Sequence, residues 1–245
     1  MFEPMKRIQM HSLLNNRKLW AIIPAAGSGS RFSKTALKQY QTIQNKTVLE
    51  HTIQRLTALP LSGYVLAISE QDDVAKTLNF NDPDKAMFCL GGAERVDSVL
   101  NGLRYLSDIA SDEDWVFVHD AARPCVSIEC LECLLATAIE SDQSAILAIP
   151  VRDTLKCVSE THDIEKTVDR SQLWQAQTPQ MAKLGVLRKA IEFALEKGIS
   201  ITDEASALET LGKTVQVVAG RSDNIKITYP EDLELAKLIL QSQNV

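Results

Sequence analysis

Six short apolar segments, separated by stretches with helical periodicity, constrain the fold of this chain more than any other feature. Each segment is continuously apolar rather than alternating, which is typical of strands covered on both faces. The segments occupy residues 19–25, 64–69, 86–90, 115–119, 145–149 and 214–219. Strands that alternate with helices predict an α/β fold with a doubly wound, mostly parallel sheet. In such sheets, ligands bind at the carboxyl ends of the strands.

Capping signals mark the expected helices. Thr47 and Glu50 have the spacing of a capping box, which opens a helix with Leu49 and Ile53 on one face. Gly198 and Gly212 stand where the C-terminal glycines of two helices belong. The other helices are expected at about residues 94–107, 128–140, 182–197, 203–211 and 231–241. With 245 residues in all, we expect one domain over residues 19–245 and a flexible N-terminal extension over residues 1–18.

Composition excludes several classes of protein. The formal net charge of −6 argues against general nucleic-acid binding. No apolar run approaches the ~20 residues of a membrane span, and residues 1–18 contain no apolar segment of the kind found in a secretory signal. The five cysteines are expected to be reduced thiols, so we expect a cytoplasmic protein that binds neither nucleic acid nor a membrane.

Cys130 and Cys133 form a C-x-x-C pair, with Cys125 nearby. A zinc site would need a fourth ligand, and no histidine has a suitable spacing. We favour a helix that Ser127 caps and on which the two cysteines lie one turn apart.

Residues 151–172 interrupt the alternation of predicted strands and helices. Two β-like segments, 154–159 and 164–169, flank a polar turn at residues 160–163. An isolated two-stranded hairpin is only marginally stable in water. We therefore predict an arm that packs against a second copy of the chain in a homodimer. The alternative is an excursion folded onto its own domain.

The segment from Pro24 to Arg31 has the character of a phosphate-binding loop. An apolar strand leads into small residues, which let backbone N–H groups approach an anion, and the cations Arg31 and Lys38 follow. The spacing is neither that of a Walker loop nor that of a dinucleotide fingerprint, which would have glycine in place of Phe32. The alternative is an ordinary Gly-Ser turn.

Polar residues follow another predicted strand at residues 119–124. Asp120 ends this strand and is placed to hold Mg²⁺, a cation that prefers oxygen ligands. Arg123 has the fork geometry that pairs with phosphate. The alternative is a helix-capping aspartate with an arginine partner. We expect His119 to be a supporting or core residue rather than a base, and Lys226 to add positive charge for a second phosphate.

Taken in order, these motifs resemble the 2-C-methyl-D-erythritol 4-phosphate cytidylyltransferase family over about residues 19–241. The matching motifs are Pro24-Ala-Ala-Gly-x-Gly-x-Arg31, Lys38-Gln-Tyr40, Gly91-Gly-x-x-Arg-x-x-Ser98, His119-Asp-Ala-Ala-Arg-Pro124, Thr178-Pro-Gln180, Thr202-Asp-Glu-Ala-Ser206 and Asn224-Ile-Lys226. The first motif is shared with many nucleotidyltransferases, whereas the ordered set is specific.

The resemblance implies a Rossmann-like nucleotidyltransferase fold and an enzyme that joins CTP to methylerythritol phosphate, releasing pyrophosphate, with Mg²⁺ as cofactor. It assigns catalysis to Arg31 and Lys38, which would contact the triphosphate. It places CTP near Pro24, Ala25, Ala26, Gly27, Gly29, Gly91, Ser98, Asp120 and Ala121, with Asp120 also the metal ligand. It places the sugar phosphate near Arg123, Thr154, Arg170, Thr178 and Lys226, with Arg170 reaching the partner subunit's site.

Two positions depart from the family pattern. Leu37 stands where the family usually has proline before the lysine, and Ser30 replaces a residue that is often basic. Three other functions remain alternatives. They are a ribitol-5-phosphate cytidylyltransferase with the same chemistry, a non-catalytic nucleotide-binding protein, and an NAD-binding oxidoreductase that the missing third glycine disfavours.

Overall fold

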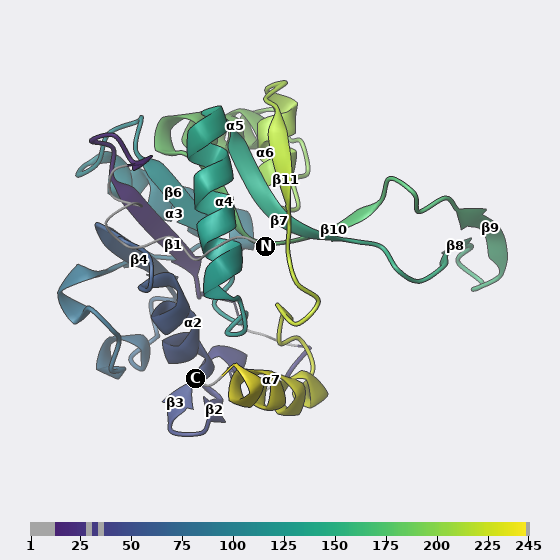
Figure 1. Cartoon of the computed structure of the whole chain (residues 1–245), viewed down its shortest axis with the longest axis horizontal. Helices are drawn as coiled ribbons and strands as arrows, with labels where there is room; N and C mark the ends of the chain where they lie inside the picture. The colour runs from purple at the N-terminus through teal and green to yellow at the C-terminus, as the bar shows by residue number, and fades with distance from the viewer. Residues whose placement is uncertain (1–12, 28–30, 34–36, 244–245) are drawn as a thin grey trace.

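A seven-stranded sheet forms the centre of the molecule (Figure 1). The computed structural model describes residues 13–27, 31–33 and 37–243. The sheet has the order β11-β7-β10-β6-β1-β4-β5. Its strands are β1 (Leu19–Pro24), β4 (Gly63–Ile68), β5 (Ala86–Leu90), β6 (Trp115–Val118), β7 (Ser144–Pro150), β10 (Trp174–Lys183) and β11 (Val215–Ala219). The neighbours of β1 and β4 all run parallel, as does β11 beside β7, which confirms the predicted mostly parallel sheet.

Helices cover both faces of this sheet and make a three-layer α/β/α sandwich. The side chains of β1 alternate between the two faces: Ala21 and Ile23 pack in one apolar cluster, and Trp20 and Ile22 in the other. The first cluster lies under α2 (Val48–Leu56) and α4 (Ile128–Ser141), and the second under α3 (Arg95–Ser107), α5 (Leu184–Glu196) and α6 (Glu204–Thr210). Burial on both faces explains why the strands are continuously apolar.

A smaller apolar cluster joins the C-terminal helix α7 (Pro230–Ser242) to a short hairpin of β2 (Thr42–Ile43) and β3 (Lys46–Thr47). Its buried members include Ile43, Ala122, Ile227 and Leu240. This cluster brings the segment before α7 back over the carboxyl ends of the central strands, where Ile227 donates its backbone N–H to the carbonyl of Ala122 at 2.9 Å.

The capping signals are confirmed. Thr47 and Glu50 make both hydrogen bonds of the capping box at the start of α2. Gly198 and Gly212 have φ angles of 65° and 63°, in the left-handed region that glycine tolerates at the ends of helices.

Strand β10 was not predicted, and it corrects the expected boundaries of the next helix. It runs antiparallel between β6 and β7, in the middle of the sheet, and α5 starts at Leu184 rather than at residue 182. The pairing of β10 with β7 shifts register between Ala176 and Gln180, and this shift accommodates Pro179. Glutamines and a proline made the segment look like a loop.

The predicted hairpin exists as β8 (Leu155–Val158) and β9 (Ile164–Val168), which pair only with each other. The hairpin projects far from the body at the end of two long connections (Figure 1). Most of its residues are exposed, among them Ile164 at 65 % and Val158 at 48 %. The alternative of an excursion folded onto its own domain is therefore wrong, whereas a partner for the hairpin stays a prediction.

Most of the expected N-terminal extension, residues 1–12, lies outside the described residues. Its last part packs on the body: Leu14 is buried in the core, and Arg17 pairs with Asp142 at 2.7 Å. From Leu14 onward the chain therefore belongs to the folded body rather than to an extension.

The cysteine pair lies on a helix, as predicted. Ser127 caps α4 by accepting the backbone N–H of Cys130, and Cys133 lies one turn further. Within the described ranges, no three His, Cys, Asp or Glu side chains come together as a metal site. In the same part of the chain, no helix is long and apolar enough to cross a bilayer.

Candidate active site

One pocket lies at the carboxyl ends of the parallel strands β1, β5 and β6, where the fold predicts a ligand. Its volume is about 160 Å³. The residues that line it are Pro24, Ala25, Ala26, Gly27, Lys38, Gln39, Gly92, Ala93, Glu94, Arg95, Ser98, Asp120, Ala121, Ala122 and Lys226. Five separate segments of the chain therefore meet in one hollow.

The small-residue loop after β1 forms one side of the pocket. Gln39 holds the start of this loop, because its side-chain amide donates to the carbonyl of Ala25 at 3.0 Å. Gly29 lies outside the described residues. Arg31 is exposed and does not line the pocket, although its charge acts on Lys38. The loop thus presents small residues to the pocket with a cation at its edge.

Lys38 opens a short turn, η1 (Lys38–Tyr40), beside this loop. Its Nζ donates to the backbone carbonyl of Ile227 at 2.9 Å, which ties the turn to the segment before α7. Tyr40 anchors the other end of the turn by donating its hydroxyl to Asp72. Burial lowers the pKa of Lys38, the positive charge of Lys226 lowers it further, and Asp120 opposes both.

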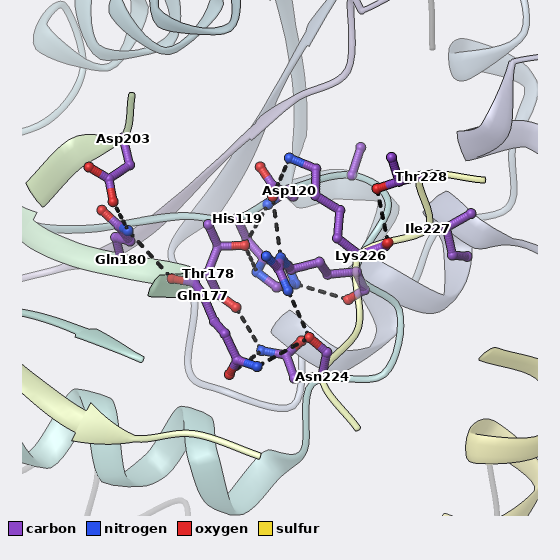
Figure 2. Close-up of polar contacts among 12 residues, drawn as sticks. His119, Asp120, Gln177, Thr178, Gln180, Asp203, Asn224, Lys226, Ile227 and Thr228 are labelled. Atoms are coloured by element: carbon purple, nitrogen blue, oxygen red, sulfur yellow. Dashed lines mark hydrogen bonds and ion pairs between the residues drawn. The ribbon is translucent and has the colours of Figure 1, made fainter. Parts of the chain in front are cut away.

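Asp120 is buried just after the end of β6, where three cations contact it; Figure 2 shows one of them, Lys226. Its Oδ1 accepts from Arg95 at 3.0 Å, and its Oδ2 accepts from Lys226 at 2.9 Å and from Arg123 at 3.3 Å. Burial alone would raise the pKa of Asp120, but the charges of these three cations hold it well below the usual range. Asp120 is therefore a carboxylate at any working pH, and it has the arginine partner of the alternative interpretation, whereas the predicted contacts with Mg²⁺ and phosphate stay predictions.

Arg95 connects this cluster to a second buried carboxylate. Its two terminal nitrogens donate to the carboxylate oxygens of Glu204 at 2.6 and 3.1 Å, while its Nε reaches Asp120. Both Arg95 and Glu204 stand inside motifs that the sequence singled out, but neither was assigned a role. Their pairing could not be predicted from either motif, because the two residues lie 109 positions apart in the chain.

Gly91 and Ser98 act on the shape of the pocket in different ways. A Cβ on Gly91 would lie 2.3 Å from the Cβ of Ala26, so only glycine lets the two loops approach this closely. Gly91 itself does not line the pocket, whereas Ser98 does. The hydroxyl of Ser98 accepts the backbone N–H of Gly92 at 3.0 Å and holds the loop that follows β5.

Thr178 lies on β10 directly beside the Asp120 loop (Figure 2). Its hydroxyl accepts the backbone N–H of Asp120 at 3.1 Å and lies 3.0 Å from Nδ1 of His119. The side-chain amide of Asn224 donates to the carbonyl of Thr178 at 3.0 Å, and the carbonyl of Asn224 accepts from Arg123 at 2.7 Å. The structure thus brings together Arg123, Thr178 and Lys226, as predicted.

His119 is fully buried under these groups. Its Nε2 lies 3.1 Å from the backbone carbonyl of Arg123. Burial lowers the pKa of His119 to about 4. The ring is neutral at neutral pH and has no path to solvent, which agrees with a supporting residue rather than a base.

Thr154 and Arg170 lie in the hairpin region, away from the pocket. Both are exposed, and Arg170 donates to the backbone carbonyl of Arg152 at the base of the hairpin. Neither residue lines the pocket at the strand ends of its own chain.

A family model for 2-C-methyl-D-erythritol 4-phosphate cytidylyltransferase matches residues 19–242. The chain belongs to this family. A relative of that name from Acinetobacter baumannii strain SDF is 69% identical over 235 residues, which cover 96% of this chain and 99% of the relative. One from Acinetobacter baylyi is 70% identical over 226 residues, with 92% and 95% covered.

Solved structures agree with the family. The crystal structure of 2-C-methyl-D-erythritol 4-phosphate cytidylyltransferase from Francisella tularensis superimposes with a TM-score of 0.79 at 40% identity, covering 91% of this chain and all of that one. A crystal structure of 4-diphosphocytidyl-2C-methyl-D-erythritol synthase has a TM-score of 0.79 at 38% identity, with 92% and 99% covered. The family's nucleotidyltransferase fold is therefore the fold of this chain.

Proposed function

We propose that this protein transfers the cytidylyl group of CTP to 2-C-methyl-D-erythritol 4-phosphate, giving 4-diphosphocytidyl-2-C-methyl-D-erythritol and pyrophosphate for isoprenoid precursor synthesis by the non-mevalonate route. The single observation that carries this proposal is the convergence of Lys38, Arg95 and Lys226 on one pocket at the strand ends, where Arg123 also pairs with Asp120. Family membership selects the substrates, and it favours methylerythritol phosphate over the ribitol phosphate alternative.

The chemistry explains the excess of cations. An oxygen of the methylerythritol phosphate attacks the α-phosphorus of CTP, a new P–O bond forms, and the bond to the pyrophosphate leaving group breaks. The attacking oxygen is already anionic, so the reaction needs no general base. The barrier lies in bringing anions together and in line, and fixed positive charge lowers it. Arg31 and Lys38, beside the small-residue loop, are suited to the triphosphate.

Lys38 is suited to this role because it is held in place. The carbonyl of Ile227 fixes its Nζ, and the Gln39 amide couples its turn to the carbonyl of Ala25 in the loop. A lysine fixed before the substrate arrives needs little reorganisation in the transition state.

We further propose that the reaction uses Mg²⁺, with Asp120 as its protein ligand. Mg²⁺ commonly takes one or two carboxylates and completes its shell with water and substrate phosphates. Asp120 supplies one ionised carboxylate to the pocket lining, and a bound ion would take the place of one of the cations that now contact its oxygens. When bound, the ion supplies charge neutralisation between the phosphates. This chain's own part is to keep Asp120 ionised, which its three cationic neighbours do.

We also propose a cytoplasmic homodimer whose hairpins reach across to the partner subunit. The hairpin exposes apolar side chains, including Val158, Ile164 and Trp174 at its base, that a second copy would cover. Thr154 and Arg170 would then complete the sugar-phosphate site of the partner subunit.

The deciding experiment measures pyrophosphate release by the purified protein with CTP and Mg²⁺. Methylerythritol phosphate and ribitol 5-phosphate are compared as acceptors. We expect release with methylerythritol phosphate alone and none after EDTA, with an unchanged melting temperature. Release with ribitol phosphate would move the substrate and keep the chemistry. Binding of CTP without release from either acceptor would point to a non-catalytic protein.

A further inference from the structure

The turn η1 carries Lys38, and each of its three side chains is tied to a different part of the body. Lys38 is bonded to the segment before α7, and Gln39 to the loop after β1. Tyr40 is bonded to the loop after β4, where its hydroxyl donates to the carboxylate of Asp72. Hydrogen bonds within a turn of three residues are local, so these three attachments determine where the turn lies.

Asp72 is a fixed acceptor. It is buried, and its Oδ1 accepts the backbone N–H groups of Val74 and Ala75, both at 3.1 Å. Its own N–H donates to the carbonyl of Ser69 at 3.1 Å, and Ser69 directly follows β4, the neighbour of β1 in the sheet. These bonds leave Oδ2 to face the Tyr40 hydroxyl. The central sheet therefore positions the acceptor that holds the turn.

The ring and the hydroxyl of Tyr40 do different things. The ring packs against the apolar cluster under α2 and α4. Apolar packing is non-directional and tolerates small shifts, whereas a hydrogen bond from a hydroxyl to a carboxylate is directional and charge-assisted. Loss of the hydroxyl alone would leave the ring packed and release one of the three attachments of the turn.

We propose that Tyr40 and Asp72 are positioning residues for Lys38: their hydrogen bond sets the turn so that the Lys38 ammonium group meets the triphosphate. The proposal rests on the proposed function, which assigns Lys38 to the reacting phosphates. Lys38 lines the pocket and Tyr40 does not, so the pair acts through the turn rather than on the substrate. A shift of a catalytic group by about 1 Å can cost about 10² in rate, so a released turn lowers kcat.

The first test removes only the hydroxyl, in Tyr40→Phe. We expect kcat for pyrophosphate release to fall about tenfold. The KM for methylerythritol phosphate, whose proposed site lies on other residues, should stay within about twofold of wild type. The matched control is Tyr64→Phe. Tyr64 is buried on β4, and its hydroxyl donates to the carbonyl of Asn81 at 2.9 Å, outside the pocket.

The control separates positioning from stability. A hydroxyl that only stabilises the fold should behave in Tyr40→Phe as it does in Tyr64→Phe, with a lower melting temperature and an unchanged kcat. That result would overturn the proposal. A fall in kcat confined to Tyr40→Phe supports it.

The second test asks whether the hydroxyl acts through Lys38. Tyr40→Phe is combined with Lys38→Ala, and kcat of the double variant is compared with that of Lys38→Ala alone. We expect a further fall of less than about twofold, because no ammonium group is left to position. A further tenfold fall would mean that Tyr40 acts on another group, and it would overturn the proposal.

A third measurement needs no substrate. Hydrogen–deuterium exchange is followed by mass spectrometry in peptides that span residues 37–43. The amides of Tyr40 and Gln41 close the turn with hydrogen bonds of 3.1 and 3.3 Å and report on it. We expect faster exchange there in Tyr40→Phe and wild-type exchange in Tyr64→Phe. Unchanged exchange in Tyr40→Phe overturns the proposal. Absent pyrophosphate release from the wild-type protein, with the expected exchange pattern, would instead refute the proposed function and leave the anchor of the turn confirmed.

Discussion

The guanidinium of Arg95 donates to both carboxylate oxygens of Glu204, at 2.6 and 3.1 Å. Burial alone would lower the pKa of Arg95, but the carboxylates of Glu204 and Asp120 raise it. Glu204 is 3 % exposed, and both of its carboxylate oxygens accept from this partner. The pair joins the start of α3 to the start of α6 across the edge of the pocket.

Replacing Arg95 with methionine should therefore destabilise the protein by about 3 kcal/mol, because a buried carboxylate loses its charged partner. Chemical denaturation measures the change in the free energy of unfolding. The matched control is Arg104→Met, since Arg104 pairs with Glu192 at 3.2 Å on the exposed surface. Such a pair contributes about 0–1 kcal/mol. Equal losses in the two variants would contradict the role of Arg95 in the fold.

Lys38→Ala should lower kcat by about 10²-fold or more, because it removes a fixed cation from the developing charge. The melting temperature should barely change, since Lys38 is half-buried and its Nζ makes one hydrogen bond to the backbone. Pyrophosphate release measures the effect. Lys46→Ala is a suitable control, because Lys46 bonds Gln54 outside the pocket. Near-normal turnover by Lys38→Ala would refute charge neutralisation by this residue.

Much of the fold could be predicted because most central strands are buried on both faces. Residues such as Ile22 and Phe117 are apolar for that reason alone, and each run of them indicates one strand. Strand β10 was not predicted because it carries polar side chains that contribute to the site. Gln177 and Gln180 are buried there, and their amides bind the Arg221 carbonyl and the Asp203 carboxylate. A local pattern does not distinguish such a strand from a polar loop.

Part of the candidate site could likewise be predicted from the sequence, and part could not. Loops that follow strands, with Lys38 and Asp120, could be placed at one edge from the sequence alone. The grouping of Arg95, Arg123 and Lys226 around a single carboxylate depends on three distant segments, which only the folded chain brings together. Sequence reasoning therefore located the pocket but not its electrostatics.

Mixing two inactive variants would test the proposed exchange of arms. If the hairpin completes the partner subunit's site, a dimer of one Lys38→Ala chain and one Arg170→Ala chain carries both defects in one site and none in the other. Refolding or co-expressing the two should restore about a quarter of wild-type activity, since half of the dimers are mixed and each has one intact site. Mixtures that stay as inactive as their components would contradict an exchanged arm.

The buried His119 should make stability depend on pH. Its pKa is about 4 in the folded protein, below the ordinary value of 6.5. Between these values the unfolded chain binds the proton and the folded chain does not, so the free energy of unfolding falls as pH falls. From pH 7 to pH 5 the loss is about 2 kcal/mol. Denaturant titrations at both pH values should show a smaller loss in His119→Asn. The same loss in both proteins would exclude His119 as its source.

Leu37 stands immediately before Lys38 and adopts a backbone that proline can share. Its φ is −76° and its ψ is 125°, and it begins the turn that carries Lys38. Leu37→Pro should therefore raise stability by about 0.4–1 kcal/mol, because proline reduces the freedom of the unfolded chain. The hydrogen bonds that hold the turn, from Tyr40 to Asp72 and from Gln39 to Ala25, do not involve the Leu37 side chain.

Differential scanning calorimetry would measure the gain, and Leu37→Ala serves as the control that removes the side chain without restricting φ. Turnover should remain within about twofold of wild type, because Lys38 already has its anchor at the Ile227 carbonyl. A marked rise in kcat with proline would instead mean that leucine leaves Lys38 too free in this chain. A loss of stability would mean that the backbone at this position differs from the one described.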